Sequence, residues 1–128
     1  MLTGFQANLK APDLDEVVAF YEGKLGLPIV DRRSMGPGHG DVLIGVGDAT
    51  ICVETGEGGR ADTPIGFEVE DVEAVVEELR RRGVEPEEYD LPSIKTVNGI
   101  ASWGDLKAAW VKDPGGNLIG IVTRVRSR

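Results

Sequence analysis

The chain reads Ile65-Gly66-Phe67-Glu68-Val69-Glu70-Asp71-Val72-Glu73-Ala74-Val75-Val76-Glu77-Glu78-Leu79 near its middle. This stretch changes its hydrophobic period at Asp71. Before Asp71, apolar residues alternate with others, which is typical of a β-strand with one buried face. After Asp71, apolar residues recur at helical spacing as far as Gly83, and the Asp71 side chain can cap the free amides of the first turn. The stretch therefore predicts a strand that runs directly into an amphipathic helix.

The same pattern occurs about half a chain length earlier. Residues 5–11 alternate in the same way, and a helix pattern begins after Asp13 and ends near residues 23–26. Each helix pattern is followed by three β-rich runs, at residues 28–33, 42–46 and 50–54, and at 87–94, 107–111 and 118–123. This internal repeat predicts an α+β fold of two βαβββ modules, about 1–56 and 64–126, within one domain covering residues 1–128. The Gly-rich polar residues 55–63 are predicted to link them.

Composition excludes several classes of function. The net charge of −8 repels phosphate backbones and anionic membranes, so neither nucleic acid nor a membrane is expected as a partner. One cysteine cannot form an internal disulfide, and the N-terminal residues carry no apolar run long enough for a signal peptide or membrane span. A cytoplasmic location is therefore expected.

Several spaced signatures resemble the vicinal oxygen chelate superfamily, which contains glyoxalases, bleomycin-resistance proteins and dioxygenases. They are Asp13-Leu14 with Phe20-Tyr21 and Leu25-Gly26-Leu27, residues 67–72 with Gly83-Val84, and the hairpin Asp113-Pro114-Gly115-Gly116-Asn117. The resemblance implies that the two modules form a cupped, partly open mixed barrel around a groove, with the helices outside. It also implies a homodimer.

The resemblance places the four metal positions of the superfamily at Gln6, Cys52, Pro64 and Gly120. Proline and glycine side chains cannot donate to a metal. We therefore predict no metal cofactor; a divalent metal, if bound, would be held by Gln6 and Glu54, with water completing its coordination. Glu54 follows Cys52 by two residues and faces the same way, so either residue can occupy the second position.

Strand alternation identifies the side chains that face the groove. Phe5, Ala7 and Leu9 are expected to pack under the helix. The side chains of Gln6 and Asn8 then point into the groove. In residues 50–55, Ile51 and Val53 pack outward, leaving Cys52 and Glu54 inside. Glu54 is a candidate general base or a hydrogen-bond acceptor for a ligand, although a carboxylate at the rim in water fits equally well. The predicted ligand-binding residues are Gln6, Asn8, Cys52, Glu54, Trp103 and Trp110.

The two tryptophans suggest a flat, partly apolar ligand. Trp103 is predicted in a turn between strands, where an aromatic ring covers a groove mouth or a subunit contact. Trp110, in the strand before the hairpin, lines either the groove or the core. The prediction is a protein that binds a small organic molecule without the usual metal site. Two alternatives stay open: a metal-dependent lyase, isomerase or dioxygenase acting on adjacent oxygens, and a partner protein whose groove is an interaction surface.

Overall fold

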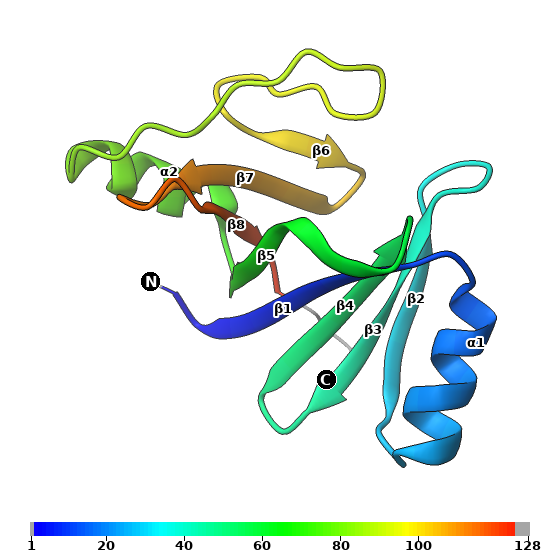
Figure 1. Cartoon of the computed structure of the whole chain (residues 1–128). Coiled ribbons are helices and arrows are strands. Elements are labelled where there is room, and N and C mark those ends of the chain that lie inside the picture. Colours follow the sequence, from blue (N-terminus) through cyan, green and yellow to red (C-terminus); the bar gives the residue numbers. More distant parts are fainter. Residues whose placement is uncertain (1, 125–128) are drawn as a thin grey trace. The chain divides into compact units, whose positions relative to one another are not determined.

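The structure is a computed structural model that describes residues 2–124, apart from the side chain of Arg60 (Figure 1). It divides into two compact units, which we describe separately. The N-terminal unit comprises residues 5–64, and the C-terminal unit comprises residues 2–4 and 65–124. No helix within the described residues is long and apolar enough to cross a membrane.

The N-terminal unit contains a mixed sheet with a helix on one face. Its elements are β1 (Gly4–Ala11), α1 (Leu14–Val18), the π-helical turn η1 (Ala19–Lys24), β2 (Ile29–Ser34), β3 (Gly40–Val46) and β4 (Ala49–Thr55). The strand order is β2-β3-β4-β1, with β1 parallel to β4 and the other pairs antiparallel. The Asp13 side chain accepts hydrogen bonds from the amides of Asp15 and Glu16 and so caps the N-terminus of α1.

The C-terminal unit repeats this topology. It contains the end of β5 (Gly59–Val69), α2 (Val72–Arg81), β6 (Ala101–Trp103), β7 (Leu106–Lys112) and β8 (Leu118–Thr123). The strand order is β5-β8-β7-β6, and β5 is parallel to β8. Each unit therefore has the order βαβββ, which confirms the predicted α+β class and the module repeat.

The hydrophobic cores lie between each helix and its own sheet. In the N-terminal unit, Leu9, Ile51 and Val53 pack with α1, which confirms the predicted alternation of β1 and β4. In the C-terminal unit, Phe67 and Val69 pack with α2 in the same way. The prediction for Phe5 is wrong, because 42% of this side chain is exposed. Phe5 lies roughly 13 Å along β1 from Leu9, beyond the sheet area that the short α1 covers.

Two predictions of local structure are also wrong. Residues 87–94 form no strand, and the strand that follows α2 is β6 instead. Pro86 and Pro92 carry no N–H for a strand ladder, and the loop satisfies its backbone locally, as in the hydrogen bond from Thr96 N to Tyr89 O. Within the predicted link, residues 59–63 belong to β5 rather than to a flexible segment.

A polar sheet face with a buried ion pair

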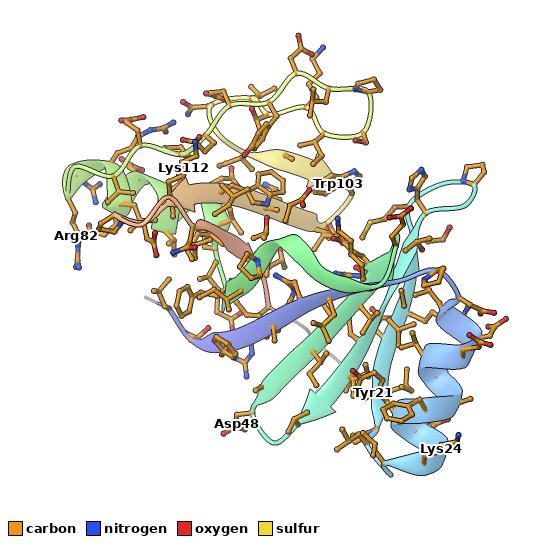
Figure 2. The ribbon with its side chains drawn as sticks, in the orientation of Figure 1. Tyr21, Lys24, Asp48, Arg82, Trp103 and Lys112 are labelled. Carbon is orange, nitrogen blue, oxygen red and sulfur yellow. The ribbon has the colours of Figure 1, made fainter. Side chains whose placement is uncertain are left out.

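Four of the six predicted ligand-binding residues lie on one face of the N-terminal sheet. This face is turned away from α1, and we call it the polar face. Direct cross-strand pairs link Gln6 with Thr50, Asn8 with Cys52, and Lys10 with Glu54. Because direct partners point to the same side of a sheet, these side chains share the polar face. Figure 2 shows Tyr21 on the opposite side, next to the sheet face that η1 and α1 cover.

Two amide side chains are joined in a chain of hydrogen bonds on this face. Gln6, which is only 6% exposed, donates Nε2–H to Asn8 Oδ1 at 2.8 Å. Asn8 Nδ2–H donates to the backbone carbonyl of Thr63 at 2.8 Å. Gln6 Oε1 accepts no hydrogen bond from any residue that the structure describes. The arrangement fixes the Gln6 side chain and leaves it one free acceptor.

A buried ion pair lies next to these residues. Arg33 Nε and Nη2 donate to the two carboxylate oxygens of Asp41 at 2.8 and 2.6 Å, and Asp41 is only 3% exposed. Cys52 Sγ lies 3.5 Å from Asp41 Oδ2. Sequence reasoning missed this pair because it began the strand at Val42, two residues after its actual start at Gly40. Asp41 and Leu43 are two residues apart, so their side chains point to the same face of the sheet. Leu43 pairs with Cys52, which places Asp41 on the face of Cys52.

Glu54 stands between two charged partners. In register it lies opposite Asp41 on β3 and opposite Lys10 on β1. Burial raises the pKa of the Glu54 carboxyl; Lys10 opposes this rise, and Asp41 and Asp62 add to it. Lys10 Nζ lies 3.5 Å from Asp62 Oδ1. Glu54 is therefore a carboxylate with a raised pKa that can accept a hydrogen bond from a ligand.

Both tryptophans lie in the C-terminal unit, on the sheet face turned away from α2. Trp103 pairs with Leu106, and Trp110 pairs with Gly120. Trp103 ends β6 (Figure 2), so the prediction that it lies in a turn is wrong; the turn begins at Gly104. The Trp110 ring contacts the Tyr89 ring edge to face, with centroids 5.5 Å apart. This contact gives Trp110 a packing role within its own unit.

Comparison with known proteins identifies the family. Residues 6–121 match the model of the Glyoxalase/Bleomycin resistance protein/Dioxygenase superfamily. The chain belongs to this superfamily. No curated protein matches the chain at significant similarity.

Solved structures of this superfamily share the fold at low sequence identity. A hypothetical protein from Bacillus halodurans is 15% identical with a TM-score of 0.65, covering 97% of this chain and 94% of its own. Methylmalonyl-CoA epimerase from Mycobacterium tuberculosis is 22% identical with a TM-score of 0.64, covering 95% and 88%. The Streptomyces coelicolor epimerase, in complex with 2-nitronate-propionyl-CoA, is 20% identical with a TM-score of 0.65, covering 98% and 97%. At these identities the likeness shows the fold alone.

The residues of this superfamily member do not fit a metal site of several side-chain ligands. Pro64 and Gly120 offer no donor atoms. Burial raises the pKa of the Cys52 thiol well above its usual value, and the charge of Asp41 adds to the rise. Among the described residues, no group of three or more His, Cys, Asp or Glu side chains could hold a metal ion. On the polar face, the Asn8 and Cys52 pair separates Gln6 from Glu54 along the strands.

Proposed function

We propose that this superfamily member binds a small organic molecule through the polar face, without a metal ion. The proposal rests on the hydrogen bonds and ion pairs that Gln6 and Glu54 make and on those that they lack. Gln6 is buried and fixed by Asn8, yet its Oε1 accepts no hydrogen bond from a described residue, and Glu54 makes no hydrogen bond or ion pair with any side chain that the structure describes. A few placed polar groups on an otherwise packed surface are what a specific ligand site requires. Asn8 and Cys52, which lie between them, are the other proposed contacts.

A second candidate is an enzyme of the same superfamily that acts on a substrate with adjacent oxygens. The observation that favours it is Glu54, whose raised pKa brings the carboxyl closer to the range in which a general base works. The epimerases among the structural neighbours make methylmalonyl-CoA one compound to try. In a lyase, isomerase or dioxygenase of the metal-dependent kind, removal of metal would abolish ligand binding or turnover.

A thermal-shift screen with organic compounds, including methylmalonyl-CoA, tests the proposal. We expect at least one compound to raise the Tm of protein treated with EDTA. Glu54→Ala should weaken its binding about tenfold or more, because a charged hydrogen-bond partner is lost. The matched control is Glu22→Ala, which removes an exposed glutamate of η1 and should leave binding unchanged. Gln6→Ala is less suitable, since it also removes the buried hydrogen bond to Asn8.

Two results would contradict this function. Elemental analysis showing about one transition metal per chain, together with a lower Tm in EDTA and binding only after metal is restored, would favour the enzyme. Binding that is equal in the parent and in Glu54→Ala would place the ligand elsewhere and remove the polar face as the site.

We also propose that the protein is a homodimer. Several large apolar side chains are at least 40% exposed, among them Leu2, Phe5, Phe20, Leu25 and Val46. Covering such side chains in a closed pair with twofold symmetry removes apolar surface from water. Gel filtration with light scattering should give a mass of twice 13.7 kDa. A mass of 13.7 kDa at micromolar concentration would show that the chain is monomeric.

A further inference from the structure

The loop between α2 and β6 contains the one Asn-Gly pair of the sequence, Asn98-Gly99 (Figure 1). The pair forms the turn of a tight hairpin, because Val97 and Ile100 exchange both backbone hydrogen bonds, at 2.9 and 3.1 Å. Asn98 has φ of +56° and Gly99 has φ of +81°, and a type I′ hairpin turn needs positive φ at both central residues. Asn98 is exposed to water, whereas Gly99 is buried.

An asparagine that is followed by glycine is chemically reactive. The Gly99 nitrogen, once it has lost its proton, can attack Asn98 Cγ. A new N–C bond forms, the Cγ–Nδ2 bond breaks, and the side-chain nitrogen takes up a proton and leaves as ammonia. Water then opens the cyclic imide at either carbonyl carbon, which gives aspartate or isoaspartate. Glycine has no side chain to obstruct the attack, whereas the other asparagines, Asn8 and Asn117, are each followed by leucine.

Two charged side chains hold the peptide unit that would react. Glu88 Oε1 accepts a hydrogen bond from Gly99 N at 2.9 Å. Arg80 Nη2 donates to the carbonyl oxygen of Asn98 at 3.1 Å. Glu88 is itself anchored, since Thr96 Oγ1 donates to the same carboxylate oxygen at 2.6 Å. The N–H and the C=O of one peptide unit are therefore each bound by a charged group.

These hydrogen bonds oppose the attack. A residue in the left-handed conformation directs the next backbone nitrogen away from its own Cβ, so ring closure requires the peptide unit to rotate out of the hairpin and to break both bonds. The hydrogen bonds from Thr96 and from Gly99 N also lower the pKa of the Glu88 carboxyl. Glu88 is therefore a weak base, which holds the Gly99 N–H rather than removing its proton.

We propose that Asn98 is a site of spontaneous deamidation, and that the contacts of Glu88 and Arg80 suppress the reaction while the loop is closed. Conversion then occurs only when the loop opens, so its rate reports how often this segment unfolds locally. The change is irreversible and alters the loop. Isoaspartate places an additional methylene group in the main chain, which the two-residue turn cannot accommodate. The site is separate from the polar face, since all of these residues belong to the C-terminal unit.

Incubation of the purified chain at mildly alkaline pH, followed by peptide mapping with mass spectrometry, measures the conversion. The reference is the same chain unfolded in guanidinium chloride. We expect Asn98 in the folded chain to convert at a rate about tenfold or more below that of the unfolded chain. Glu88→Ala should raise the rate in the folded chain about tenfold, because a hydrogen bond to a charged group is lost. Asn8 and Asn117 in the same digests should stay unconverted.

Glu87→Ala is the matched control. It removes the neighbouring carboxylate, which forms an ion pair with Lys112 at 3.3 Å, and should leave the rate unchanged. Arg80→Met removes the contact to the Asn98 carbonyl and should also raise the rate. Glu88→Gln keeps an oxygen acceptor for the buried N–H and should lie between the parent and Glu88→Ala. The Tm of each variant separates local opening from global unfolding, and if Glu88→Ala fails to fold, Glu88→Gln and Arg80→Met provide the test.

Three results would overturn the proposal. Equal rates in the folded and the unfolded chain would show that the loop gives no protection. A lower rate in Glu88→Ala than in the parent would make Glu88 a base that activates the Gly99 nitrogen. Equal acceleration in Glu87→Ala and Glu88→Ala would trace the effect to the charge of the loop rather than to the hydrogen bond.

Discussion

Gly99→Ala is expected to lower the free energy of unfolding by about 3 kcal/mol. Gly99 has φ of +81°, a conformation that costs any residue with a Cβ about 1–2 kcal/mol. An added Cβ would also lie 2.4 Å from Pro86 Cγ and 2.9 Å from Pro86 Cβ. The loop cannot easily move away, because Gly99 N donates to the Glu88 carboxylate at 2.9 Å. Urea unfolding followed by tryptophan fluorescence and circular dichroism measures the loss.

Gly116→Ala is the matched control, since it separates backbone strain from steric overlap. Gly116 has the same φ of +81°, but a Cβ added there would meet no atom within 4 Å. We expect a loss of about 1 kcal/mol from the backbone alone. Equal losses in the two variants would show that the Pro86 ring moves aside at no cost, and the packing argument for this loop would be wrong.

The loop that contains Gly99 also includes residues 87–94, for which the prediction from sequence was wrong. Residues 87–94 have strand-like composition, but the Glu88 carboxylate accepts hydrogen bonds from Thr96 and from Gly99 N, which close a compact loop. These bonds join residues 8 and 11 positions apart through one side chain. Hydrophobic alternation carries no information about such contacts. Local composition therefore predicted the wrong conformation there.

Alternation succeeded where a strand had one face against a helix. The period of two in β4 placed Val53 in the core and Cys52 and Glu54 on the other face, because a shift by one residue would reverse every side chain. The partners across the sheet could not be predicted in the same way. A register shift between Ile29 and Asp31 in β2 decides that Arg33 meets Asp41, and nothing in the local sequence specifies this bulge.

The ion pair between Arg33 and Asp41 predicts a second large loss of stability, in the variant Asp41→Asn. We expect this substitution to lower the free energy of unfolding by about 3 kcal/mol, because it leaves the Arg33 guanidinium partly buried without a counter-charge. Burial is the first influence on the pKa of Arg33 and lowers it, but the hydrogen bond and charge of Asp41 give a net rise. The carboxylate thus supplies the stabilisation that the neutral amide lacks. Denaturant unfolding at neutral pH measures the difference.

Asp15→Asn is the control for charge removal as such. Asp15 forms an ion pair of 2.7 Å with Arg32, but both side chains are largely exposed, so we expect a loss below about 1 kcal/mol. Replacing both buried partners, as Arg33→Met with Asp41→Leu, should recover most of the stability lost in Asp41→Asn, since no charge is then left unpaired. If Asp41→Asn costs no more than Asp15→Asn, the Arg33–Asp41 pair is solvated in solution, and the argument that burial makes it strong is wrong.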